Sequence, residues 1–193
     1  MQNLKIYFTS DLHGYVYPTD YVHRCKKPLG LLNIINQFNK DENTLIIDGG
    51  DTIQGSPFTN YLSNAEFHIH PMATIMNEAG YDYVTLGNHD FNYGYDYLKR
   101  FLNNLYAKCL CSNVKDKTHG LNILPCDIKV MGNGLKVGLM GFTTDFINLW
   151  ERAESIENFE ISDTFTSISS SYEELKKKAD ILIGIYHGGF EYD

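Results

Sequence analysis

Short apolar runs alternate with segments of helical periodicity along this chain of 193 residues. Most of the runs are rich in β-branched and aromatic residues and do not alternate cleanly between apolar and polar positions, which is typical of strands buried on both faces. We predict strands at residues 4–8, 44–48, 81–86, 135–142 and 180–186, with a small further strand within residues 107–113.

Four segments carry apolar residues at the spacing of an amphipathic helix. They are residues 29–38, the stretch that opens after Pro71 and closes at Gly80, residues 97–105, and residues 163–179. Asp163 or Thr164 can cap the start of the last one. Because strands alternate with helices, the pattern predicts an α/β sandwich with a mostly parallel central sheet and the helices outside.

One segment interrupts this alternation. In residues 127–139, Asn133-Gly134 lies between two apolar runs, which is a strong β-hairpin signal and predicts one antiparallel pair. The sequence contains no internal repeat and no linker rich in Pro, Gly or Ser. The chain length fits a single domain, so we interpret residues 1–193 as one domain.

The charge balance limits the classes of partner. The formal net charge is -8 and the sequence pI is about 5.3, which argues against binding of DNA or RNA over a broad surface. A small anionic substrate needs a local source of positive charge in such a protein. A bound metal ion would supply it.

The sequence also bears on compartment and redox state. No stretch approaches the ~20 apolar residues of a membrane span, and the N-terminus lacks the features of a signal peptide. We expect a cytoplasmic protein, with export as the alternative if a leader preceded this sequence. The four cysteines, Cys25, Cys109, Cys111 and Cys126, form no CxxC pair, so we expect them to be reduced and mostly buried, and a cysteine zinc site is the less favoured alternative.

Polar residues follow four of the predicted strands at the point where each strand ends. They are Asp11 and His13, then Asp51, then Asn88, His89 and Asp90, and finally His187. The carboxyl ends of parallel strands form the ligand-binding edge of an open α/β sheet, so four segments are predicted to meet at one site. Each motif alone has an ordinary explanation as a turn or a helix cap, but four at strand ends favour a functional site.

The chemistry of this set suits a divalent transition metal. Carboxylate, imidazole and amide groups form a mixed nitrogen and oxygen shell that favours Mn, Fe, Zn or Ni over calcium. Asp11 and His13 are two residues apart, so both can face one ion from an extended segment. Asp51 has two carboxylate oxygens and could bridge two ions that lie ~3.5 to 4 Å apart.

Four stretches carry a family resemblance. "TSDLHG" at residues 9–14, "IIDGGDTIQGSP" at 46–57, "YVTLGNHDFNYG" at 83–94 and "IYHGG" at 185–189 resemble the successive motifs of the calcineurin-like metallophosphoesterases. They are most similar to the branch of 5'-nucleotidases and 2',3'-cyclic phosphodiesterases. The resemblance covers essentially the whole chain in the right order.

The resemblance implies roles for individual residues. Asp11 and His13 would bind a first metal, Asp51 would bridge two metals, and Asn88 and His187 would bind the second. His89 would lie beside the substrate phosphate and Asp90 would orient it. The implied activity is hydrolysis of nucleotide monoesters or cyclic diesters by a hydroxide that bridges the two ions.

One motif of the family is absent. The family completes both metal shells with a Gly-His-x-His segment, which this sequence lacks; His68-Ile69-His70 has similar spacing but stands at the wrong place in the order of the motifs, and we interpret it as a loop before a helix. We therefore expect a catalytic domain incomplete at its C-terminal end, without the family's nucleoside-binding domain. Such a chain would hold one metal ion or none tightly and would be weakly active or inactive. The alternative is a non-catalytic module that binds metal or phosphate in regulation or assembly.

Overall fold

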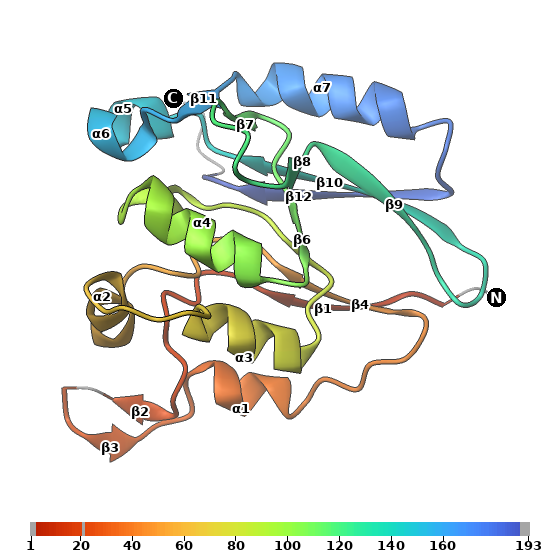
Figure 1. Ribbon diagram of the computed structural model, residues 1–193. Helices are drawn as coiled ribbons and strands as arrows, with labels where there is room; N and C mark the ends of the chain where they lie inside the picture. Colours follow the sequence, from red (N-terminus) through yellow and green to blue (C-terminus); the bar gives the residue numbers. More distant parts are fainter. Residues whose placement is uncertain (1–2, 21, 190–193) are drawn as a thin grey trace.

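Two β-sheets face each other in the computed structural model, which describes residues 3–20 and 22–189 (Figure 1). The larger sheet has the order β1-β4-β5-β6-β8, and all of its neighbouring strands are parallel. Its strands are β1 (Lys5–Thr9), β4 (Thr44–Asp48), β5 (Tyr83–Val84), β6 (Lys108–Leu110) and β8 (Ile123–Leu124). The predicted class, an α/β fold with a mostly parallel sheet, is confirmed.

The smaller sheet contains the predicted hairpin. Its order is β12-β10-β9, with strands β9 (Cys126–Val130), β10 (Lys136–Thr143) and β12 (Ile181–His187). β9 and β10 pair antiparallel through a loop in which Gly134 has a φ of 84°, a conformation that glycine adopts without strain. β10 and β12 run parallel, which brings the end of the chain's last strand back to the same edge as β1 and β4.

The helices are α1 (Leu31–Ile35), α2 (Pro57–Ser63), α3 (Pro71–Ala79), η1 (Asn88–Phe91, a 3-10 helix), α4 (Tyr95–Asn104), α5 (Ile147–Trp150), α6 (Ala153–Ile156) and α7 (Thr164–Leu175). Three of the helices, α1, α3 and α4, pack on the larger sheet, and α7 covers the smaller one (Figure 1). α3 has the predicted bounds and ends at Gly80, whose φ is 76°. Asp163 caps α7 by accepting a hydrogen bond from the Thr166 N–H at 2.7 Å.

Three apolar clusters separate the layers. One packs α1, α3 and α4 on the larger sheet, a second fills the space between the sheets, and a third packs α7 on β10. The central strand β4 contributes Ile46 to the first cluster and Leu45 and Ile47 to the second. It is therefore buried on both faces, as predicted.

Other elements differ from the sequence prediction. β1 is an edge strand, so Ile6 and Phe8 are 42% and 56% exposed instead of buried. α1 is shorter than predicted because Gly30, with a φ of 88°, sets its start and the chain turns again after Asn36. α2 was not predicted; it begins at a capping box formed by Ser56 and Thr59.

Two small antiparallel pairs were also not predicted. They are β2 (Thr19–Asp20) with β3 (Cys25–Lys26), and β7 (Val114–Asp116) with β11 (Phe159–Ile161). All four cysteines are free, and Cys109 and Cys111 are buried while Cys25 is exposed. Among the described residues, none of the helices has the length and apolar character needed to cross a bilayer.

Candidate functional site

The loops that follow β1 and β4 continue the pairing of their strands. The Gly49 N–H donates to the Thr9 carbonyl at 2.7 Å, the Asp11 N–H to Gly50 at 2.9 Å, and the His13 N–H to Asp51 at 2.8 Å. The two loops are therefore joined by backbone hydrogen bonds beyond the ends of the strands. This fixes the segments that carry Asp11, His13 and Asp51 side by side.

Three candidate ligands have left-handed backbone conformations. The φ angles of Asp11, His13 and Asp51 are 55°, 47° and 57°, and five described residues other than glycine have a positive φ. Such conformations cost energy and persist where the surrounding structure enforces them, most often at functional sites. The strain is consistent with side chains held for a purpose other than stability.

The side chains of these three residues converge. One ligand atom from each of Asp11, His13 and Asp51 lies within 4.8 Å of the others. His13 Nε2 is 3.8 Å from Asp11 Oδ1 and 3.9 Å from Asp51 Oδ2. The predicted first metal site is thus brought together by the fold.

His187 reaches the same place from the smaller sheet. It is the last residue of β12, and its Nε2 lies 3.2 Å from Asp51 Oδ2. Its Nδ1 donates to the Gly49 carbonyl at 2.7 Å, and the Nδ1 of His13 donates to the Gln54 carbonyl at the same distance. Metal-binding histidines are typically fixed in this way, with the second ring nitrogen left for the ion.

His187 and Asp51 form a charged pair in the metal-free protein. Burial by itself would lower the pKa of His187, but the hydrogen bond and negative charge of Asp51 raise it to about 9. Burial would raise the pKa of Asp51, and the hydrogen bond and charge of His187 lower it instead. A metal ion at this position would take the place of the His187 proton.

Asp90 is buried beneath the cluster and holds the backbone of two loops. Its Oδ2 accepts from the Asp51 and Gly87 N–H groups, both at 2.9 Å, and its Oδ1 accepts from Thr52 and Ile53 at 2.8 and 3.1 Å. Burial and the nearby charge of Asp51 raise its pKa, against the effect of these donors. The hydrogen bonds given for Asp90 all come from backbone amides, and its role in orienting His89 stays a prediction.

His89 contacts the cluster through its backbone and a neighbouring side chain through its ring. Its backbone N–H donates to Asp51 Oδ1 at 2.8 Å, and its ring lies 5.5 Å from the His13 ring. The Nδ1 atom is 2.8 Å from Asn92 Oδ1, so Asn92 is a site residue that the sequence reading missed. Asn88 is half-buried at the start of η1, directly before His89, and its role as a ligand stays a prediction.

Asp48 is a second buried carboxylate that the sequence reading missed. Its Oδ1 accepts from the Gly50 N–H and the Thr52 hydroxyl, and its Oδ2 accepts from the Thr9 hydroxyl. Burial raises its pKa to about 7, although these donors act in the opposite direction. Asp48 therefore supports the turn that leads to Asp51.

Two glycines allow the loops to approach each other. A Cβ on Gly50 would lie 2.4 Å from the Gly87 nitrogen, and a Cβ on Gly87 would lie 2.1 Å from Asp51 Oδ1. Neither space can hold a side chain. The glycines beside the candidate ligands are thus required by close packing of backbone against backbone.

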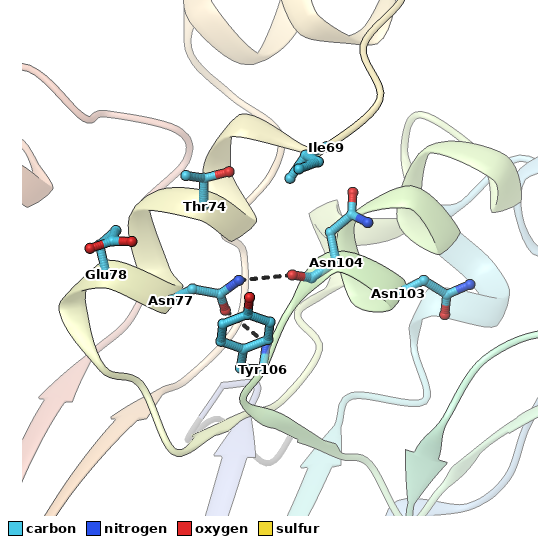
Figure 2. A pocket seen from close by; sticks show the side chains of 7 residues that line it. All are labelled: Ile69, Thr74, Asn77, Glu78, Asn103, Asn104 and Tyr106. Atoms are coloured by element: carbon cyan, nitrogen blue, oxygen red, sulfur yellow. Dashed lines mark hydrogen bonds between the residues drawn. The ribbon is translucent and has the colours of Figure 1, made fainter.

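Two surface hollows lie away from this cluster, along α3 and α4. One, of about 270 Å³, is lined by the amide side chains of Asn77, Asn103 and Asn104 together with Ile69, Thr74, Glu78 and Tyr106 (Figure 2). His70 precedes α3 in a loop, as predicted, and is fully buried among aromatic rings, with neither ring nitrogen bonded to any described residue. Neither hollow includes a residue of the Asp11, His13 and Asp51 group.

The donor set fits a divalent metal ion. Two carboxylates and two imidazoles face one another, both histidines present Nε2 to Asp51, and their Nδ1 atoms are held by backbone carbonyls. Such a mixed shell suits a transition metal. Asp11, His13 and Asp51 would hold an ion, and His187 lies beside them against Asp51.

Known proteins share this arrangement of sequence and fold. A 2',3'-cyclic-nucleotide 2'-phosphodiesterase/3'-nucleotidase of Salmonella typhimurium is 31% identical over 99% of this chain and 32% of its own length. A crystal structure of a putative 5'-nucleotidase from Staphylococcus aureus has 38% identity and a TM-score of 0.87 over 97% of this chain and 38% of that one. The calcineurin-like phosphoesterase YfkN from Bacillus subtilis has 29% identity and a TM-score of 0.83 over 97% of this chain and 63% of that one.

The chain spans about a third of the length of the Salmonella relative. The family described as calcineurin-like phosphoesterase matches residues 4–192, which include every residue of the cluster. Asp11, His13, Asp51 and His187 converge within this matched range. The chain therefore belongs to the calcineurin-like phosphoesterase family.

Proposed function

We propose that this chain is the metal-binding catalytic part of a hydrolase that cleaves phosphoesters of nucleotides. The observation that carries the proposal is the convergence on Asp51, whose carboxylate faces the Nε2 atoms of His13 and His187 and accepts the His89 N–H. Such a centre supplies positive charge to an acidic protein whose net charge is -8.

The bound ions would lower the pKa of a water molecule that attacks phosphorus and would neutralise the phosphoryl oxygens. The protein's own residues have separate tasks. His13 and His187 bind through Nε2, and Asp90 holds the loops that carry Asp51 and Gly87. His89 lies beside His13 and can donate a proton to a phosphoryl oxygen or to the leaving oxygen.

Nucleotides are the substrate class that we favour. The Salmonella relative is named as a cyclic-nucleotide phosphodiesterase and 3'-nucleotidase, and mouse and rat relatives are named as 5'-nucleotidases. We propose a nucleotide monoester or a 2',3'-cyclic diester as the substrate of the whole protein. Two ions in the complete enzyme, and weaker retention of metal by this chain, belong to the same proposal.

The test is a hydrolysis assay with manganese and an aryl phosphate mono- or diester, together with a manganese titration. We expect Asp51→Asn to abolish both turnover and metal binding. His89→Asn should lower turnover by about 100-fold, as expected for loss of a general acid, and should leave metal binding unchanged.

The same assay separates the alternatives. Loss of metal binding in the His89→Asn variant would contradict the assigned roles. Metal binding without turnover, in this chain and in a longer one that also supplies a Gly-His-x-His segment, would favour a non-catalytic metal or phosphate-binding module.

A further inference from the structure

A chain of two hydrogen bonds links His89 to a distant segment. Asn92 Oδ1 lies 2.8 Å from His89 Nδ1, and Asn92 Nδ2 donates to Glu151 Oε2 at 2.6 Å. Glu151 directly follows α5 and is 59 residues away from Asn92 in the sequence. The link therefore connects the end of η1, which follows β5 of the larger sheet, to the segment that follows β10 of the smaller sheet.

The Glu151 carboxylate fixes which atoms donate and which accept in these two hydrogen bonds. An ionised carboxylate only accepts hydrogen bonds, so the amide nitrogen of Asn92 must face Glu151 and its oxygen must face His89. An amide oxygen also only accepts, so the proton of the His89 ring must be on Nδ1. Nε2 is then the atom that is left for the substrate.

His89 differs in this respect from the two metal-facing histidines. His13 and His187 donate from Nδ1 to backbone carbonyls, which can only accept a hydrogen bond. The acceptor for His89 is a side-chain amide, which could present either its oxygen or its nitrogen without the Glu151 contact. The contact with Glu151, which lies outside the metal cluster, therefore bears on which nitrogen of the His89 ring carries the proton.

We propose that Glu151 is a positioning residue that acts through Asn92 to hold His89 in its Nδ1–H tautomer, with Nε2 directed to the phosphoester. The catalytic consequence rests on the proposed function, whereas the tautomer does not. To act as the acid, the ring first takes up a second proton on Nε2, and when the bond between phosphorus and the leaving oxygen breaks, that proton passes to the oxygen. The ring that remains is neutral and still protonated at Nδ1.

The test is ¹⁵N NMR of the histidine rings in the metal-free protein at mildly alkaline pH, with the His89 signals identified by their loss in His89→Asn. We expect a protonated Nδ1 and an unprotonated Nε2 in the wild type. Glu151→Ala should shift His89 toward the Nε2–H form that free imidazole side chains prefer. Glu151→Gln should give a mixture of the two forms, because its amide can present either its oxygen or its nitrogen to Asn92.

Two further variants protect this test from indirect effects. Glu154→Ala removes an exposed carboxylate from the neighbouring helix α6 and should leave the His89 signals unchanged. Asn92→Ala breaks the same link from its other end and should reproduce the tautomer shift if Glu151→Ala fails to fold. An Nε2–H ring in the wild type, or an unchanged ring in both folded variants, would overturn the proposal.

Turnover provides the second readout. Glu151→Ala should lower kcat about tenfold for a substrate with a poor leaving group, which is a part of the ~100-fold or more that a general acid contributes. The decrease should be smaller for a nitrophenyl ester, because its leaving group needs less help from an acid. Metal affinity should not change. A tautomer shift in this chain, with no turnover either in it or in a longer chain that also supplies a Gly-His-x-His segment, would contradict the proposed function and still support the positioning role, so the two failures are distinguishable.

Discussion

Aspartates at the same edge of the sheet occupy two different layers. The inner carboxylates, Asp48 and Asp90, are buried, and each accepts from at least three donors of the backbone or of threonine hydroxyls. The outer ligands, Asp11, His13, Asp51 and His187, direct their free atoms at one another. The same residue type therefore builds the framework in one layer and the candidate metal centre in the other.

The electrostatics of the two layers also differ. Burial raises the pKa of both inner carboxylates, whereas His187 lowers the pKa of Asp51 in the outer layer. Substitutions in the inner layer should therefore change the stability of the fold. Substitutions in the outer layer should change metal binding with a smaller effect on stability.

The largest effect on stability is expected for Asp90→Asn. Each carboxylate oxygen of Asp90 accepts from two backbone N–H groups in the wild type. In the variant, an NH₂ group would replace one of these oxygens, so two buried N–H donors would lose their acceptor. At about 1 to 3 kcal/mol for each unsatisfied group, we expect the free energy of unfolding to fall by about 4 kcal/mol. Urea denaturation of the metal-free protein measures this loss.

Asp51→Asn is the matched substitution in the outer layer. It keeps an oxygen that can accept the His89 N–H but removes the charge beside His187. We expect a stability loss of only about 1 kcal/mol in the metal-free protein, because His187 can then become neutral. Equal losses in the Asp90→Asn and Asp51→Asn variants would show that the two layers are not distinct.

The next largest effect is the dependence of the free energy of unfolding on pH that Asp48 causes. Its pKa is about 7 in the folded protein and about 3.8 when unfolded, so its contribution to stability is present below pH 3.8 and is lost as pH rises through about 7. Asp48→Asn cannot ionise, and its amide nitrogen can donate to Thr9. We expect the wild type, compared with this variant, to lose about 3 kcal/mol between about pH 5 and about pH 8. Parallel pH profiles of the two proteins would contradict this expectation.

Gly50→Ala should have an intermediate effect. Its Cβ would meet the Gly87 backbone nitrogen at 2.4 Å, and its φ of 97° is strained for any side chain. We expect a loss of about 2 kcal/mol in the free energy of unfolding. Gly134→Ala is the control, because its φ is also positive but nothing lies within 4 Å of the added Cβ. An equal loss in both variants would show that the close approach of the loops has no energetic consequence.

His70→Leu should have the smallest effect. Burial lowers the pKa of His70 to about 3, so the wild type loses stability as pH falls below 6.5. We expect this histidine to account for about 1 kcal/mol between about pH 7 and about pH 5.5, and the variant to lack that dependence. Its manganese titration should match the wild type, and weaker binding would mean that the His68-Ile69-His70 segment takes part in the metal centre.

The arrangement of strands and helices could be predicted from the sequence because the two signals that mark it, the apolar runs and the hairpin turn, are local. Apolar runs that lead to Asp11, Asp51 or His187 mark the strands and the edge where their ends meet, and Asn133-Gly134 marks the hairpin. The edge position of β1 could not be predicted, because it depends on which strands pair with it.

The supporting contacts of the site were less predictable. Asp90 directly follows His89, which suggested a contact between them, yet its partners come from residues 51–53 and Gly87. The hydrogen bond between Asn92 and Glu151 joins residues far apart in the sequence and depends on the path of the chain after β10. A sequence motif identifies the ligands, whereas side-chain direction decides which neighbour supports them.

Anomalous diffraction at the manganese edge, from crystals of this chain soaked with the metal, tests the central claim most directly. We expect a peak between the donor atoms of Asp11, His13 and Asp51, and a second, weaker peak or none beside His187. Well-ordered crystals with no peak at Asp51, or with manganese bound only at other residues, would contradict the assignment of this cluster as the metal centre.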